Sequence, residues 1–283
     1  MRIHHLDCGT MCPVAGRLLG AAGPDLFTRG HLVCHCLLVE TARDGLVLVE
    51  TGFGTADCTD PTRLPSAFRA LASPRLALAD TALHRVRALG FAAADVRHVV
   101  VTHLDLDHAG GLSDFPHATV HLHRRELDAA TKPATWAERN RYLPHQWAHR
   151  PRWSPYTEDG DTWLGLPAVR RLTGLDADIA LLPLHGHTRG HSAVVVRDRS
   201  GWLLHAGDAY FHHRELVEPV DAPIGVRAFQ TVAQVDAVGR LASQAALRRL
   251  HREHPEVAIT SAHDPAELAR ERFVRRTAIS GSS

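Results

Sequence analysis

The sequence lacks a hydrophobic run long enough to cross a membrane. A membrane helix needs ~20 consecutive apolar residues, and no stretch of the 283 residues approaches this length. The N-terminal sequence MRIHHLDCGTMCP also lacks the long apolar segment of a secretory signal. We therefore expect a soluble, cytoplasmic protein.

An excess of one charge is missing as well. The chain has 32 lysines and arginines against 31 aspartates and glutamates, which gives a formal net charge of +1. A clear positive excess is the usual sign of bulk attraction to nucleic acids or anionic membranes. The balance therefore favours a small-molecule substrate, with no nucleic acid and no membrane as partner, and leaves a homodimer open.

The cysteines do not indicate a disulfide framework. Their number, five, is odd, and the spacings C-x-x-x-C and C-x-C have no second pair downstream to complete a zinc site. We interpret all five as buried free thiols: Cys8, Cys12, Cys34, Cys36 and Cys58.

What is present is the composition of an ordinary globular protein, 45% hydrophobic and 22% charged. Repeats, low-complexity blocks and Gly/Ser linkers are missing, so we expect one mixed α/β domain over residues 1–283. Residues 131–163 hold four of the five tryptophans without a clear period and predict a lid or an irregular excursion. Residues 277–283 predict a frayed tail.

Apolar β-type runs and helical periodicities alternate along the chain. Asp44-Gly45 predicts a hairpin turn between two of the strands, and Asp80 is the expected cap of the first helix. The predicted strands are 35–40, 46–50, 99–101, 179–184, 193–197, 202–205 and 257–261, and the predicted helices are 80–89 and 226–250.

Histidines and aspartates follow four of these strands. The stretch HLDLDH begins at His103, HGHTRGH begins at His185, and the triplets GDA and HDP contain Asp208 and His263. Four such groups packed into six residues would repel or stay unsatisfied in an apolar site unless water or cations compensate them. Histidine and carboxylate are common metal ligands, so the set indicates a site for two divalent ions.

In these motifs and in their order, the chain resembles the metallo-β-lactamase superfamily, most closely the N-acyl homoserine lactonase-like group. The resemblance covers most of the chain and implies a four-layer αββα sandwich in a single domain. It implies that His103, Asp105 and His187 hold one metal, that Asp107, His108 and His263 hold the other, and that Asp208 bridges them.

The resemblance also implies a binuclear metal-dependent hydrolase. A metal-bridging hydroxide would attack an ester-like carbonyl, with a lactone as the leading substrate. Asp107 and Asp208 would be the catalytic residues, with Asp107 passing a proton to the leaving alkoxide. Glu50 and His191 would orient the ligands. No G-x-S-x-G sequence offers a serine nucleophile instead.

Three positions depart from the family pattern. Members usually have histidine in place of Asp105, aspartate in place of Glu50, and tyrosine in place of Phe211. We interpret Asp105 as a ligand, which adds a negative charge to the cluster. This extra charge predicts a preference for iron or manganese over zinc.

The substrate-binding residues are expected near the bridging aspartate and in the tryptophan-rich stretch. They are Tyr210, Phe211, His212, Trp136 and Trp147. The arginines of this stretch, Arg139, Arg141, Arg150 and Arg152, either meet an anionic substrate or are solvated.

Other functions stay open on the same residues. A thioesterase or a phosphodiesterase of this fold would use the same cluster. The carboxylate of Asp105 suggests an iron-dependent oxidoreductase as a second class, and a binding protein with a degenerate site is a third.

Overall fold

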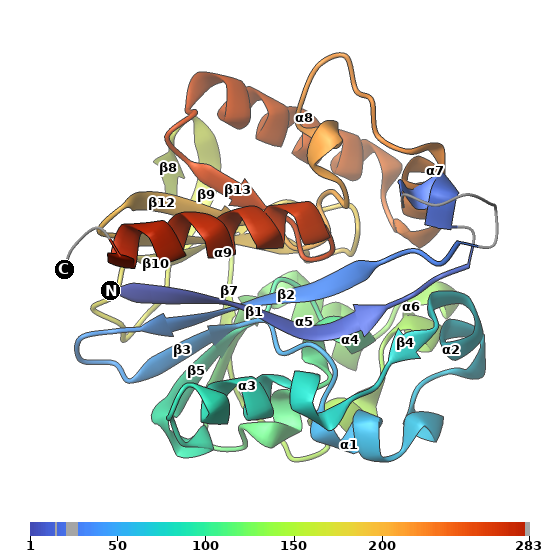
Figure 1. Cartoon of the computed structure of the whole chain (residues 1–283), viewed down its shortest axis with the longest axis horizontal. Helices are drawn as coiled ribbons and strands as arrows, with labels where there is room; N and C mark the ends of the chain where they lie inside the picture. Colours follow the sequence, from blue (N-terminus) through green and yellow to red (C-terminus); the bar gives the residue numbers. More distant parts are fainter. Residues whose placement is uncertain (15, 21–27, 281–283) are drawn as a thin grey trace.

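The computed structural model describes residues 1–14, 16–20 and 28–280. It contains two β-sheets that face each other (Figure 1). The first sheet has the strand order β4-β1-β2-β3-β5-β6-β7. Its strands are β1 (Arg2–Met11), β2 (Leu32–Glu40), β3 (Leu46–Val49), β4 (Pro74–Arg75), β5 (Val96–Val100), β6 (Thr119–His123) and β7 (Arg152–Tyr156).

The second sheet has the strand order β13-β12-β11-β10-β9-β8. Its strands are β8 (Asp161–Trp163), β9 (Leu166–Arg171), β10 (Ile179–Pro183), β11 (Ser192–Asp198), β12 (Gly201–His205) and β13 (Ala258–Thr260). The β12 and β13 pair is parallel, whereas the other pairs of this sheet are antiparallel. In the first sheet, β3, β5, β6 and β7 run parallel to one another.

Helices cover the outer faces of both sheets (Figure 1). The α-helices are α1 (Thr55–Thr59), α2 (Ser66–Ala72), α3 (Ala82–Ala88), α4 (Leu106–Ala109), α5 (Arg124–Thr131), α6 (Trp136–Arg141), α7 (Ile224–Ala233), α8 (Ala237–Glu253) and α9 (Pro265–Ser280). The 3₁₀ helices are η1 (Gly16–Leu19), η2 (Pro61–Arg63), η3 (Leu78–Asp80), η4 (Ala93–Asp95), η5 (Leu112–Asp114), η6 (Pro144–Trp147) and η7 (His213–Glu215).

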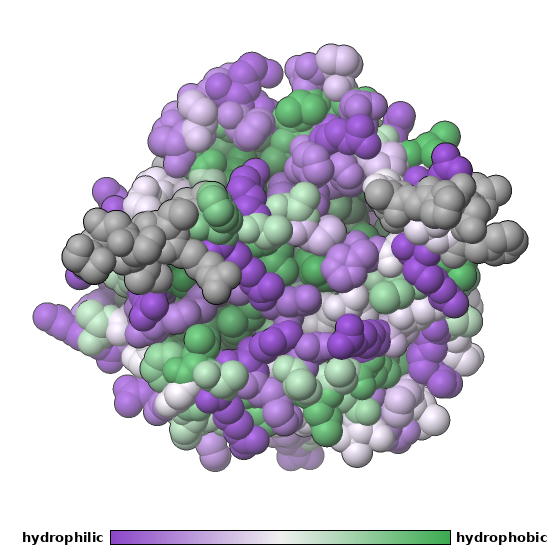
Figure 2. Space-filling view, viewed as in Figure 1, coloured by the Kyte–Doolittle hydropathy of each residue, from purple (hydrophilic) through white to green (hydrophobic). Residues whose placement is uncertain are grey.

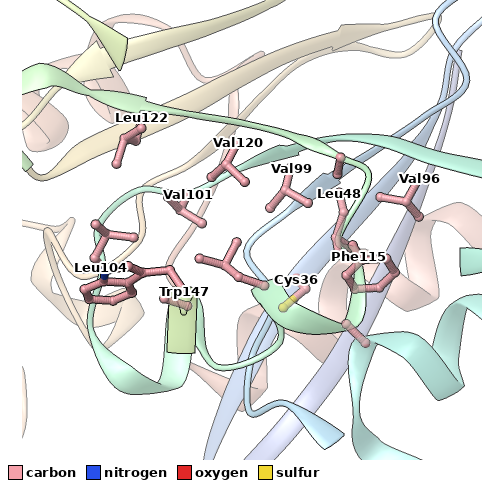
Figure 3. Packing of buried hydrophobic residues seen from close by; sticks show 14 of the residues in the cluster. Cys36, Leu48, Val96, Val99, Val101, Leu104, Phe115, Val120, Leu122 and Trp147 are labelled. Atoms are coloured by element: carbon pink, nitrogen blue, oxygen red, sulfur yellow. The ribbon is translucent and has the colours of Figure 1, made fainter. Parts of the chain in front are cut away.

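Strand alternation produces three apolar layers, because successive side chains point to opposite faces of a sheet. Leu37 packs between the two sheets, while its neighbour Leu38 packs against the helices outside the first sheet. Figure 3 shows part of this outer core, in which Leu48, Val99 and Phe115 lie close together. A third core joins the second sheet to α8. The four-layer αββα arrangement expected from the sequence is therefore present.

The predicted β2–β3 hairpin is confirmed, with Leu37 paired to Val49. Two helix predictions were wrong in detail. Thr81, not Asp80, caps α3 through a hydrogen bond from the backbone N–H of His84. The long helix expected over 226–250 is broken into α7 and α8, because Asp236 caps α8 with its own side chain.

The tryptophan-rich residues 131–163 are more regular than expected. They contain α6, η6 and the strands β7 and β8, and β7 extends the first sheet by pairing in parallel with β6. At the other end, α9 runs to Ser280 through most of the segment predicted to fray, and residues 281–283 lie outside the described residues.

Among the described residues, no helix is long and apolar enough to span a membrane. Figure 2 shows hydrophilic and hydrophobic residues interspersed over one face of the molecule.

Candidate metal centre

The predicted ligands lie just beyond the ends of strands, in loops and in the short helix α4. His103, Asp105 and Asp107 follow β5, and His187 and Asp208 follow β10 and β12. His108 lies in α4, after β5, and His263 follows β13. Because β12 and β13 run parallel, their carboxyl ends meet at one edge of the second sheet, and β5 ends at the same edge of the first. Residues up to 160 positions apart are brought together in this way.

The carboxylate of Asp208 lies at the middle of the group. Its Oδ1 is 3.3 Å from Nε2 of His108 and 3.1 Å from Nε2 of His263. Its Oδ2 is 3.3 Å from Nε2 of His187 and 3.8 Å from Nε2 of His103. One carboxylate thus faces four imidazoles, which is the position expected of a bridging ligand.

The other two aspartates divide the histidines into two groups. Oδ2 of Asp105 is 3.3 Å from Nε2 of His103 and 3.2 Å from Nε2 of His187. Oδ2 of Asp107 is 3.6 Å from Nε2 of His263. We call the first group, His103, Asp105 and His187, the N-terminal cluster. We call the second, Asp107, His108 and His263, the C-terminal cluster.

Several buried atoms of this group lack partners. Within the described part of the chain, Nε2 of His103, Nε2 of His108 and Oδ1 of Asp208 find no hydrogen-bond partner. A buried polar atom left in this state costs free energy, and a cation between the donors would satisfy all of them. These residues therefore fit a metal ion.

The opposite ring nitrogens are held by neighbouring groups. Nδ1 of His108 is 3.0 Å from Oε2 of Glu50, and Nδ1 of His263 is 2.8 Å from the carbonyl oxygen of Val33. These contacts turn Nε2 of each ring toward Asp208 and favour the tautomer that can bind a metal. Glu50 has a left-handed φ of 62°, and its Oε1 accepts a 2.6 Å hydrogen bond from the N–H of Thr102. This strained residue thus connects the β3 and β5 loops.

His191 has no ring nitrogen left for a metal. Its Nδ1 donates to the carbonyl oxygen of Leu184 at 2.8 Å, and its Nε2 accepts the backbone N–H of Asp208 at 3.0 Å. His191 therefore connects the Leu184 backbone to the Asp208 loop.

Burial disfavours the charged forms of Asp208 and His108, but the charged groups around them shift their pKa values more strongly in the opposite direction. Burial acts to raise the pKa of Asp208, yet the imidazoles of His263, His108 and His187 hold that pKa well below its usual range. Burial acts to lower the pKa of His108, yet Asp208 and Glu50 raise it well above the usual value. The carboxylate of Asp208 is therefore kept ionised and ready for a cation.

Arg141, from the last turn of α6, reaches the N-terminal cluster. Its Nε lies 2.5 Å from Oδ1 of Asp105 and its Nη2 lies 2.6 Å from Oδ2, a two-point pairing of guanidinium and carboxylate. Nη2 also lies 2.7 Å from Nε2 of His187. Although burial opposes it, this guanidinium helps to hold the pKa of Asp105 well below its usual range.

Comparisons with known proteins show the family of the chain. The family model described as "Metallo-beta-lactamase superfamily" matches residues 29–263, which is most of the chain. The chain belongs to this superfamily. The resemblance and the metallo-hydrolase class expected from the sequence are thereby confirmed at the level of the family.

A relative from Mycobacterium tuberculosis, "Probable metallo-hydrolase Rv2300c", is 40% identical over 96% of this chain and 83% of its own length. An "N-acyl homoserine lactonase AttM" from Rhizobium johnstonii is 29% identical over 69% of this chain and 75% of its own length. Among solved structures, an N-acyl homoserine lactone hydrolase with bound N-hexanoyl-L-homoserine superposes with a TM-score of 0.68. It covers 94% of each chain at 20% identity, which shows a shared fold.

The superfamily fold brings Phe211 to the cluster, but not Tyr210. The Phe211 ring lies parallel to that of His263, with centroids 5.3 Å apart, and 5.8 Å from the ring of His187. Tyr210 is fully buried and its hydroxyl donates to Oε1 of Glu267. Tyr210 therefore does not supply the hydroxyl that the family usually has at the next position.

The remaining predicted substrate residues lie elsewhere. Trp147 is buried in the outer core of the first sheet, with its ring edge-on to Trp153, so it does not line a site. Trp136 is 77% exposed at the start of α6. His212 caps η7 and stacks on His213. A cavity of about 490 Å³ between α7 and α8 includes none of the predicted ligands in its lining.

Glu126 is a supporting residue of the site that the sequence does not reveal. This fully buried residue of α5 accepts hydrogen bonds from the N–H of Leu104 at 2.9 Å and from the hydroxyl of Tyr142 at 3.0 Å. It also accepts from the hydroxyl of Thr188 at 2.7 Å and the N–H of Gly190 at 3.1 Å. Nothing in the local sequence RREL distinguishes this glutamate from a solvated helix residue.

Proposed function

We propose that this chain is a metal-dependent hydrolase that cleaves an ester-like carbonyl, with a lactone as its substrate. The observation that carries the proposal is the carboxylate of Asp208 surrounded by four imidazoles, with unpartnered buried atoms on both sides. Relatives named as N-acyl homoserine lactonases support the choice of a lactone.

The C-terminal cluster and Asp208 would hold one metal ion, and the N-terminal cluster would hold a second if Arg141 released Asp105 and His187. When bound, a metal supplies Lewis-acid chemistry, since it lowers the pKa of a water ligand and polarises a carbonyl. Asp208, with 5% of its side chain exposed, holds the charge at the centre of the group. Asp107 is more open, at 12%, and reaches solvent from the first turn of α4. It therefore suits the delivery of a proton to the leaving alkoxide.

Two ions per chain is the number expected from the sequence. Such a pair requires Asp105 and His187 to exchange their contacts with Arg141 for an ion. Arg141 also changes the charge balance, because its guanidinium offsets the carboxylate of Asp105. The charge argument for iron or manganese over zinc loses its basis, so zinc remains an equal candidate.

An apolar path leads from the cluster to the surface. Phe211 lies against His187 and His263, and it also meets the ring of Phe229 edge-on, with centroids 5.3 Å apart. Phe229 is 51% exposed on α7. A lactone with its carbonyl at the cluster would place an acyl chain along these two rings.

The homodimer left open by the sequence has a candidate surface on α7 and α8. Val232, Val238 and Leu241 are exposed there, and a second copy of the chain could cover them. Light scattering of the native chain and of Val232→Asp tests this. The cytoplasmic location stays a prediction.

Elemental analysis and a substrate panel test the function. The purified chain is analysed for metals and assayed with acyl lactones, aryl esters, thioesters and phosphodiesters, before and after chelation. We expect lactone turnover that chelation abolishes and added metal restores. Turnover of a thioester or phosphodiester alone would replace the lactone, and metal-free protein without hydrolysis would contradict the proposal.

Asp208→Ala provides the matched variant. It should lose both metal and turnover, whereas Asp161→Ala, at an exposed position of β8, should retain both.

A further inference from the structure

Arg141 stands between two predicted metal ligands. Its Nη2 is 2.6 Å from Oδ2 of Asp105 and 2.7 Å from Nε2 of His187. These two ligand atoms are 3.2 Å apart from each other. The guanidinium thus sits inside the N-terminal cluster, at the place where a metal shared by these two residues would have to lie.

The position of Arg141 is fixed from several directions. Its Nη1 donates to the carbonyl oxygen of Ala233, at the end of α7, at 2.6 Å. The helix that carries it begins with a capping box between Thr135 and Glu138, and Glu138 also pairs with Arg189 at 2.9 Å. Only 17% of the Arg141 side chain is exposed. Arg141 therefore connects α6 with the loop after β10 and with the end of α7 through specific hydrogen bonds, and it is not a solvated side chain.

The contact with His187 competes with metal binding. An imidazole nitrogen that accepts a hydrogen bond uses the same lone pair that a metal would need. A guanidinium and a divalent ion sharing Oδ2 of Asp105 would also repel each other at close range. Arg141 and an ion at the N-terminal cluster therefore exclude each other.

Among the residues that the structure describes, no arginine or lysine pairs with the C-terminal cluster. Asp107, His108 and His263 converge with Asp208 around unpartnered buried atoms. The sulfur of Cys34 lies within 4.8 Å of ligand atoms of Asp107 and His263. A full set of donors for one ion is present here.

We propose that this chain binds a single metal ion, at the C-terminal cluster with Asp208, and that Arg141 replaces the second ion at the N-terminal cluster. The inference rests on the metal dependence of the proposed function but not on its substrate. It also accounts for Asp105. A carboxylate at the usual histidine position pairs with a guanidinium in two places, which a histidine cannot do.

The replacement preserves a positive charge beside the reacting carbonyl. Arginine remains charged at all working pH values, and its planar donors are suited to an oxygen that gains negative charge. Arg141 would therefore stabilise the oxyanion, or the carboxylate product, from the side opposite the ion.

Metal counting tests the proposal without reference to activity. The native chain and Arg141→Ala are loaded with Zn²⁺ or Co²⁺, dialysed and analysed, with Arg139→Ala, an exposed position on the same helix, as control. We expect one ion per chain in the native protein and in the control, and two in Arg141→Ala. Two ions in the native protein, or one in Arg141→Ala, would overturn the proposal.

Two further variants control for misfolding and test whether the N-terminal cluster binds an ion. Arg141→Met keeps most of the apolar stem and should also gain a second ion. Asp105→Ala should retain one ion, because its carboxylate pairs with Arg141 and not with the metal; loss of the ion would contradict the proposal. Lactone turnover with two native ions would overturn this inference while leaving the proposed function intact, and one ion without turnover would do the reverse.

Discussion

Thr188 and Glu126 are 62 residues apart in the chain, and the hydroxyl of Thr188 donates a 2.7 Å hydrogen bond to Oε2 of Glu126. The same carboxylate also accepts from the N–H of Leu104 in the β5 loop. Both loops that supply the N-terminal cluster are therefore tied to one buried glutamate. Its charge is satisfied by four donors, which makes it an internal support of the site.

Glu126→Ala should destabilise the fold and loosen the cluster. It leaves four buried donors without an acceptor, each at about 1 to 3 kcal/mol, so we expect a total loss of at least roughly 4 kcal/mol. Urea unfolding measures the loss. Asp128→Ala, at a partly buried position on the same helix, should cost far less. Equal costs would show that Glu126 does not support the loops.

The sequence predicted the central strands of both sheets and the motifs that follow them, because both depend on local patterns. Apolar runs end at HLDLDH and HGHTRGH, and strand ends meet at one edge of a sandwich. The strands β1, β4, β6, β7, β8 and β9 escaped prediction. In β7, for example, Trp153 and Pro155 give no alternating pattern. The break between α7 and α8 escaped because it depends on the cap of Asp236 rather than on hydrophobic spacing.

The contacts of Arg141 could not have been predicted in the same way. The sequence alone allowed two interpretations of this arginine, a substrate contact or a solvated side chain. The structure instead shows it in contact with Asp105 and His187. Its partners Asp105, His187 and Ala233 come from three separate segments, so no spacing in the chain indicates the contact. Glu126 is missed for the same reason.

His191→Phe should weaken metal binding without removing a ligand. The change leaves the backbone N–H of Asp208 without its acceptor, so the Asp208 loop loses its anchor. Loss of such supporting contacts typically costs 10- to 100-fold in metal affinity. Competition with a chromophoric chelator measures the dissociation constant. An unchanged constant would show that the loop is held by other contacts.

Phe229→Ala should discriminate between long and short acyl chains. If the acyl group lies along Phe211 and Phe229, loss of the exposed ring removes about 1 to 2 kcal/mol of apolar contact, a roughly 5- to 30-fold rise in KM for long-chain lactones. Short-chain lactones should be little affected. Thr231→Ala, exposed on the same helix, is the control. An equal rise for all chain lengths would rule out this acyl path.

The buried His121 should make the fold sensitive to acid. Its ring nitrogens contact the hydroxyl of Tyr156 and Nδ1 of His98, both at 2.9 Å. Burial, with a smaller contribution from His98, lowers the pKa of His121 to about 3. Below pH 6.5 the unfolded chain binds a proton at His121, whereas the folded chain does not bind it until the pH approaches 3. Stability is therefore complete above pH 6.5 and is lost as the pH falls toward 3.

His121→Gln should remove this contribution. Between pH 7.5 and pH 5, the His121 ring alone should cost the native chain about 2 kcal/mol of unfolding free energy. On the same change of pH, the unfolding free energy of the variant should fall by about 2 kcal/mol less than that of the native chain. Its stability at pH 7.5 should be lower from the start. Urea unfolding at both pH values measures the difference. His117→Gln alters an exposed histidine and should keep the native pH dependence of stability. If His121→Gln also keeps the native pH dependence, His121 takes up a proton in the folded chain as readily as in the unfolded chain.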